Sequence, residues 1–291
     1  MLHRSAILLG MICALAINWP FVAYAQGLDD GDGSDLQALG LVLVGQGLLV
    51  SEIVDGDTLV LHDGREVRLV GIQAPKLPRG RKGFRSWPLA QAAKDRLASL
   101  TLGRRVALYS GEAGTDRHNR VLAHITVHND QGTVWVQQRL LSDGLARVYS
   151  FADNRLALAP LFDAESRARR AARGLWAENF YRVWTAQKIA EAVKSRSYSG
   201  DRFELVEGRV VDVTLFRDRA YLNFGPDWRD DFSVMIKAED FRYFGESAAQ
   251  AEGFLRGLKG RQVRVRGWTY YKNGPMMRIT HKERLTLLPE M

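Results

Sequence analysis

Short apolar runs separated by tight-turn sequences are the feature that most restricts how this chain can fold. Leu49 to Val54 and Thr58 to His62 are rich in β-branched and aliphatic residues, and Asp55-Gly56-Asp57 stands between them. Asp63-Gly64 then predicts a hairpin turn before a third run, Arg65 to Ile72. Three such runs in quick succession predict a compact antiparallel sheet.

The residues that follow predict how this sheet is completed. Apolar spacing predicts a helix over 86–102, strands over 104–109 and 120–127, and two more helices over 136–142 and 159–173. Five strands with the first helix after the third are typical of a closed barrel of the OB type. The expected fold class is therefore mainly β with packed helices (α+β).

A second set of elements has the same order. Strands are predicted over 206–214, 219–224 and 232–237, then a helix over 247–258, then strands over 261–271 and 276–281. The last two form a hairpin that turns at Asn273-Gly274. Three strands, a helix and two strands predict a second small, OB-like barrel.

The N-terminus has the pattern of a signal peptide. Arg4 precedes an uncharged apolar run from Ala6 to Ala16, and Ala23-Tyr24-Ala25 is a small-x-small cleavage sequence. A membrane anchor is the alternative interpretation of this stretch. With cleavage, the mature chain has no membrane span and loses Cys13, the only cysteine. We expect an exported protein, periplasmic or extracellular, that is stabilised without disulfides.

Composition and charge divide the chain into five parts. We expect a signal peptide over 1–25, an acidic Gly/Asp-rich tether over 26–46, a first domain over 47–184, a linker over 185–203 and a second domain over 204–291. Residues 47–184 carry 21 basic and 14 acidic residues, a net charge of +7. Residues 185–291 carry 19 and 15, a net charge of +4. The positive charge is therefore concentrated in the first domain, which would attract a polyanion. The alternative interpretation is that a mildly basic pI only keeps an exported protein soluble.

The first domain also holds groups suited to phosphate chemistry. Asp55 and Asp57 lie in one turn, Arg68 lies on the third strand, and Arg120 begins a later strand after Asp116. Between them runs a basic loop, Lys76, Arg79, Arg81, Lys82 and Arg85. Guanidinium groups match phosphate oxygens two at a time, and a carboxylate beside them can hold a divalent cation. Each piece alone is also common as a turn or a solvated surface.

Together these motifs resemble the thermonuclease (staphylococcal-nuclease-like) family over residues 47–184. The matches are Asp55-Gly56-Asp57-Thr58, an arginine seven residues before Pro75, and Asp116-Arg117-x-x-Arg120-x-Leu122-Ala123, together with Gly144-Leu145-Ala146 and Gly174-Leu175-Trp176. The resemblance implies an OB barrel with helices, and calcium-dependent hydrolysis of DNA and RNA.

Carried over residue by residue, the resemblance implies that Asp57 is a calcium ligand. It also implies that Arg68 and Arg120 hold the phosphate and stabilise its transition state. Gln73 stands where the family has a second calcium-binding aspartate, and Ala74 would supply a backbone carbonyl. Lys76 stands where the family has its catalytic glutamate. An amide carries no charge and a lysine adds a positive one, so calcium binding should weaken. The family mechanism therefore cannot run here unchanged.

Three functions follow from these departures. The protein is a nuclease in which Lys76 supplies the charge of a lost metal, or a nucleic-acid-binding domain that has lost hydrolysis, or an envelope interaction protein whose barrels bind a protein or another polyanion. Nucleic acid is the expected partner of the first domain, with Arg79, Arg81, Lys82 and Arg85 as binding residues. The second domain could hold a protein partner instead.

Overall fold

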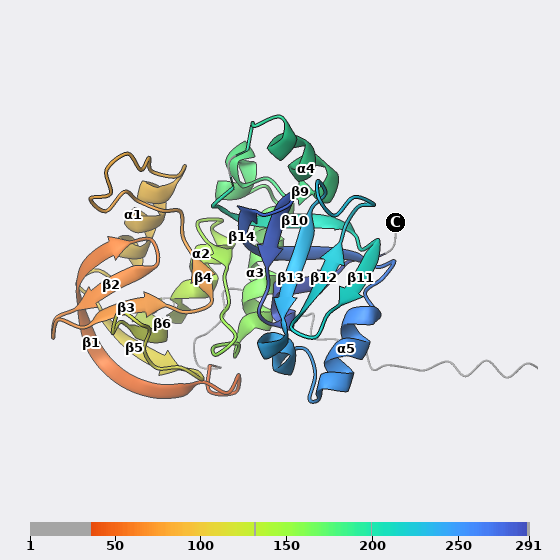
Figure 1. Ribbon diagram of the computed structural model, residues 1–291. Coiled ribbons are helices and arrows are strands. Elements are labelled where there is room, and N and C mark those ends of the chain that lie inside the picture. Colours follow the sequence, from red (N-terminus) through yellow and green to blue (C-terminus); the bar gives the residue numbers. More distant parts are fainter. Residues whose placement is uncertain (1–35, 131, 199, 290–291) are drawn as a thin grey trace, which may run out of the picture.

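The computed structural model describes residues 36–130, 132–198 and 200–289, and Figure 1 shows their arrangement. The expected signal peptide lies outside these residues. In the described part, no helix has both the length and the apolar character needed to cross a membrane.

The first barrel closes as the sequence predicts. Its five strands are β1 (Val42–Asp55), β2 (Thr58–Leu61), β3 (Glu66–Leu69), β5 (Arg105–Ser110) and β6 (Val121–Asn129). Antiparallel pairing joins β1 to β2 and β5, β2 to β3, and β5 to β6. A parallel pairing of β3 with β6 closes the ring. This is a closed five-stranded barrel of the OB type.

Helices and short strands cover the barrel (Figure 1). They are β4 (Ile72–Gln73), α1 (Ala90–Thr101), β7 (Gly132–Trp135), α2 (Val136–Ser142), β8 (Arg147–Val148) and α3 (Leu158–Arg170). The predicted first helix begins later than residue 86, because Leu89 has a left-handed backbone (φ 61°) and Ala90 is the first helical residue. Its apolar stripe, Ala93, Leu97 and Leu100, is buried as expected.

The segment expected to be a tether is partly folded. Leu36 and Leu41 are each 2% exposed and belong to the core of the first barrel, and β1 begins at Val42. The apolar residues among the glycines are therefore core residues, which composition alone did not indicate. The remainder of the tether, residues 26–35, lies outside the described residues.

The second unit has the same strand connectivity as the first. Its strands are β10 (Phe203–Arg209), β11 (Asp212–Leu215), β12 (Arg219–Asn223), β13 (Ser233–Lys237), β14 (Gln262–Tyr271) and β15 (Pro275–Arg278), with α5 (Ala248–Arg256) between β13 and β14. Taking β10 and β11 as one interrupted strand, the pairings follow the first barrel one by one, including a parallel pair, β13 with β15. β16 (Leu285–Leu287) adds to β14.

The expected linker is also structured. β9 (Trp184–Thr185) pairs with β10, and α4 (Ala186–Lys194) follows, capped by the Thr185 hydroxyl. Ile189 is fully buried in the second core, so this helix belongs to the second unit. The polar composition of the segment predicts a linker, but its apolar residues have the spacing of a helix, and this spacing is the better guide to the structure. The described residues also form short 3-10 helices at Gly174–Ala177, Asn179–Tyr181, Ala238–Tyr243 and Lys282–Arg284.

The two units meet across a polar contact that is closed to solvent. In Figure 1, α3 lies between the two sheets. From it, Glu165 forms an ion pair of 2.9 Å with Arg266 of β14, and the two side chains are 4% and 3% exposed. The Ser150 hydroxyl lies 2.6 Å from Nε2 of His281. These contacts join the two units.

Two buried histidines make the fold sensitive to acid. Burial lowers the pKa of His124 to about 3, and neither of its ring nitrogens has a hydrogen-bond partner. Burial, with the nearby charges of Arg284 and Arg155, lowers the pKa of His281 to about 3. The folded state therefore favours neutral imidazoles, whereas the unfolded chain binds protons near pH 6.5. This stability is fully present above about pH 6.5 and is lost as the pH falls toward 3.

We expect His124→Leu to flatten the loss of stability on acidification. Each buried histidine should cost about 1.4 kcal/mol per pH unit below about pH 6.5. The variant should remove one such contribution from the free energy of unfolding measured in urea between pH 7 and pH 4.5. His128→Leu, an exposed position on the same strand, is the control and should leave the slope unchanged. Equal slopes in the two variants would contradict this account.

Candidate functional site

The carboxylates of the first motif lie at one end of the first barrel, where β1 turns into β2. Gly56 lets this turn press against its neighbours, because a Cβ there would lie 2.7 Å from the Cβ atoms of both Ala74 and Ala93. The turn is therefore packed between the segment after β4 and helix α1. Asp57 is 1% exposed and Asp55 is 4% exposed.

Asp57 is held by three groups on one oxygen. Its Oδ2 accepts a hydrogen bond of 2.7 Å from the backbone N–H of Ala74, and lies 3.2 Å from Arg68 Nη2 and 3.4 Å from Lys76 Nζ. Thr58 donates to Oδ1 at 3.3 Å. Burial raises the pKa of Asp57, but the two cations and the Ala74 N–H outweigh burial and hold this pKa well below its usual range. The structure thus brings Asp57, Arg68, Ala74 and Lys76 together.

Arg68 lies buried beneath Asp57 in this site. It is 9% exposed, and its guanidinium donates to the backbone carbonyls of Leu69 and Ile72, the latter at 2.7 Å. These bonds, with the Asp57 pair, fix the guanidinium in one orientation beneath the carboxylate. Arg68 is therefore a positioned charge with little freedom to follow a ligand.

The calcium set implied by the family resemblance does not fit this arrangement. Both oxygens of Asp57 already accept hydrogen bonds, and Lys76 places a positive charge against one of them. Ala74 meets the carboxylate through its N–H, and Gln73 is 4% exposed with no partner for its Oε1. Across the described ranges, no group of three or more His, Cys, Asp or Glu side chains could hold a metal ion. A single saturated carboxylate is a poor ligand set for calcium.

Arg120 joins a chain of alternating charges beside Asp57. It forms a two-pronged bond to Asp116, at 2.6 and 2.8 Å, and lies 3.8 Å from Glu66. Glu66 is also 3.8 Å from Arg79, which in turn lies 3.3 Å from Asp55. We call these five residues the charge chain. Burial and the charge of Asp57 raise the pKa of Asp55 above its usual value.

The predicted nucleic-acid-binding loop divides into two kinds of residue. Arg79 enters the charge chain, and Arg81 turns back to donate to the carbonyls of Pro78 and Leu77 and to cover the ring of Phe84. Lys82 and Arg85 are exposed, with no ion pair to any described residue. In the described part of this loop, these two are the exposed cations whose side chains have neither an ion pair nor a hydrogen bond.

Glu66 is the member of the site that sequence reasoning missed. It lies on β3 two residues before Arg68, so its side chain shares a face with that arginine. This two-residue spacing is the sequence signal that places Glu66 beside Arg68. Glu66 itself is not part of the motifs that resemble the family. The structure places its carboxylate between Arg79 and Arg120, 3.8 Å from each.

The comparisons with known proteins identify the class of the first unit. The family model described as "Staphylococcal nuclease homologue" matches residues 66–178. This part of the chain is therefore a staphylococcal-nuclease-like segment. A thermonuclease from Staphylococcus intermedius is 25% identical over 135 residues, which cover 45% of this chain and 77% of that protein.

Proposed function

We propose that this protein is an exported nuclease that hydrolyses phosphodiester bonds of DNA or RNA without bound calcium. The observation that carries the proposal is the position of Lys76, whose Nζ lies 3.4 Å from Asp57 Oδ2. A fixed cation thus stands against the carboxylate that would otherwise bind a metal. The thermonuclease-like segment supports the reaction class, and the leader-like N-terminus supports export.

The charge chain supplies groups for the remaining steps. Arg120 and Arg79 can take the non-bridging oxygens of a phosphodiester, because guanidinium groups bind such oxygens in pairs. Glu66, 3.8 Å from both, can accept a proton from the water that attacks phosphorus. The new bond joins the water oxygen to phosphorus, the ester bond to the leaving oxygen breaks, and solvent protonates that oxygen. Lys76 and the two arginines stabilise the charge of the transition state.

The test is cleavage of labelled single- and double-stranded DNA and RNA with calcium, with magnesium and with chelator. We expect cleavage that chelator leaves unchanged. Arg120→Ala and Glu66→Gln should each lower kcat by about 100-fold or more, as the loss of one transition-state donor or of a general base does. Arg105→Ala, an exposed arginine on β5 that bonds to the Gly47 carbonyl, is the control and should keep full activity. Cleavage that requires calcium would contradict the proposal.

A charge-reversal variant tests the role of Lys76 directly. Lys76→Glu with Gln73→Asp removes the cation and adds two carboxylates beside Asp57, which is the oxygen-rich set that calcium prefers. We expect activity in this variant to become sensitive to chelator, and calcium to raise its melting temperature. Calcium should leave the melting temperature of the parent protein unchanged. Calcium-independent cleavage by the double variant would show that Lys76 does not stand in for a metal.

The second candidate is binding without hydrolysis, which the saturation of Asp57 favours. A carboxylate with its oxygens already occupied can neither bind metal nor activate water. This function requires binding of DNA or RNA that weakens steeply with salt, and no cleavage under any metal. If the pure protein shows neither cleavage nor such binding, an envelope interaction role of the barrels becomes the function to examine.

A further inference from the structure

We infer that the second unit holds a nucleotide of a single-stranded nucleic acid in a cavity of about 410 Å³, which we call the aromatic cavity. Its apolar wall is formed by Phe216, Tyr221, Trp228 and Met276, and its polar wall by residues that include Asn223 and Lys272. The inference rests on the proposed function in one respect: the strand held here would belong to the substrate of the first unit.

Two aromatic side chains of this cavity are exposed and the third, Tyr221, is half-buried; the Arg229 guanidinium lies over the ring of Trp228, 4.4 Å from its centroid. Phe216 is 55% exposed and Trp228 is 48% exposed. The ring of Phe216 meets that of Tyr221 edge to face at 6.0 Å, so the two form a corner. The three rings come from the end of β11, from β12 and from the loop before β13. Two exposed aromatic rings and a half-buried one, gathered from three elements, mark a binding surface, because a nucleobase stacks on flat rings.

The polar groups of the cavity suit a base and its phosphate. Asn223 accepts a hydrogen bond of 3.3 Å from the Ser233 hydroxyl through Oδ1, which leaves its amide N–H groups available to a base edge. Lys272 is exposed at the rim, with no carboxylate partner in the described part of the chain. Among the described residues that line the cavity, it is the only one with a charged side chain. One cation beside aromatic rings and an amide matches the chemistry of a nucleotide.

The acidic residues of the neighbouring loop are turned to other partners. Asp230 pairs with Lys194 at 3.2 Å, and Asp231 accepts a hydrogen bond of 2.9 Å from the backbone N–H of Asp227. Neither carboxylate lines the aromatic cavity. The surrounding segment, residues 185–291, has a net charge of +4 and so favours a polyanion.

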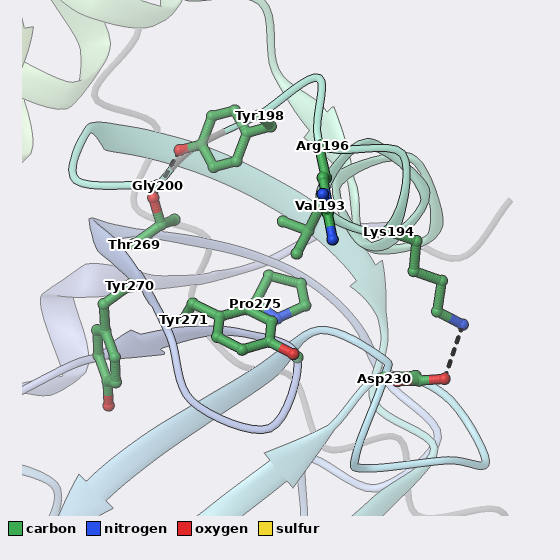
Figure 2. Close-up of a pocket in the computed structure, with 11 residues that line it drawn as sticks. Val193, Lys194, Arg196, Tyr198, Gly200, Asp230, Thr269, Tyr270, Tyr271 and Pro275 are labelled. Atoms are coloured by element: carbon green, nitrogen blue, oxygen red, sulfur yellow. Dashed lines mark hydrogen bonds and ion pairs between the residues drawn. The ribbon is translucent and has the colours of Figure 1, made fainter.

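A second cavity, of about 470 Å³, lies on the other side of the turn between β14 and β15 and is shown in Figure 2. Its polar side chains are largely satisfied by one another. Lys194 is turned to Asp230, and the Tyr198 hydroxyl lies 2.6 Å from that of Thr269. The exposed ring of Tyr271 lines this cavity. It therefore provides a control aromatic near the aromatic cavity but outside it.

The experiment measures binding of a fluorescent twelve-residue oligothymidylate to the full chain, by anisotropy at several salt concentrations. Trp228→Ala and Phe216→Ala should each weaken binding by about 5- to 160-fold, since stacking of one base contributes about 1–3 kcal/mol. Lys272→Ala should reduce the salt dependence by about one phosphate contact. Tyr271→Ala should leave affinity unchanged. Unaltered affinity in Trp228→Ala, or an equal loss in Tyr271→Ala, overturns the assignment to this cavity.

A small substrate separates this inference from the proposed function. Thymidine p-nitrophenyl phosphate carries one phosphodiester and is too short to join the two units. We expect Trp228→Ala to hydrolyse it at the parent rate while it binds the oligonucleotide more weakly. If the parent protein cleaves neither substrate but binds the oligonucleotide through Trp228, the nuclease proposal fails and the aromatic site stands. If the parent protein cleaves the small substrate, but Trp228→Ala and Phe216→Ala bind the oligonucleotide as tightly as the parent, the nuclease proposal stands and the aromatic site fails.

Discussion

Replacing Arg266 by methionine is expected to lower the free energy of unfolding by about 3–5 kcal/mol, because it leaves Glu165 charged and buried without its partner. Arg266 donates to both Glu165 oxygens, at 3.1 and 2.9 Å, and also to the carbonyl of Val148 at 3.2 Å. These contacts join the second unit to α3 and β8 of the first. Urea unfolding should therefore change from one transition to two, as the barrels lose their coupling.

Two further variants make this prediction specific. Glu165→Met together with Arg266→Met removes both charges and should recover most of the lost stability, since apolar residues of similar volume often replace a buried pair without cost. Arg256→Met breaks an exposed pair with Glu252, 3.6 Å apart on α5, and should change stability by less than about 1 kcal/mol. If Arg266→Met behaves like Arg256→Met, the contact between the barrels is not a source of stability.

Gly144→Ala is the second large effect, expected to cost more than about 4 kcal/mol, a range reached only by a few specific mechanisms. Gly144 has a left-handed backbone, with φ 69°, and a Cβ there would lie 2.1 Å from the carbonyl oxygen of Arg173. The obstacle is backbone, so no side chain can move aside. The Leu175 N–H donates to the Gly144 carbonyl at 2.8 Å, which holds the two turns in this close approach.

Gly103→Ala is the matched control for this prediction. Gly103 has nearly the same backbone angle, with φ 70°, but its missing Cβ faces open space. It should cost about 1–2 kcal/mol, the usual penalty for a left-handed residue with a side chain. The melting temperature and soluble yield of the two variants are compared. Gly103→Ala introduces backbone strain alone, whereas Gly144→Ala adds a steric clash to the same strain. Similar melting temperatures would mean that the turns can separate, and the explanation given for Gly144 would then be incorrect.

Local patterns in the sequence were sufficient to predict the first barrel. The Asp-Gly turns and short apolar runs predict β1, β2 and β3, and the structure pairs them in that order. The helical spacing after them predicts the buried stripe of α1. These predictions succeed because each depends on residues close together in the chain. The OB identity of the second unit and the export of the protein stay predictions.

Other features depended on contacts that no local pattern contains. Composition predicts that residues 36–41 belong to a tether and that α4 belongs to a linker, yet Leu36 and Ile189 are buried in the two cores. Glu66 belongs to the site because the fold brings Arg79 and Arg120, which are distant in the sequence, to within 3.8 Å of its carboxylate. The inward orientation of Arg68 depends on its hydrogen bonds to the carbonyls of Leu69 and Ile72, at and just after the end of its strand. Tertiary structure decided each of these positions.

The charge chain has a consequence for selectivity. Its two arginines are neutralised by Asp55, Glu66 and Asp116, so a phosphate must displace a carboxylate before it can bind. A lone phosphate ion gains little from this exchange, whereas a polymer can add contacts at Lys82 and Arg85. The resting site should therefore bind a small phosphate or phosphodiester weakly, and bind more tightly a chain that is long enough to make contacts elsewhere. Internal pairing of this kind makes affinity depend on the length of the bound chain.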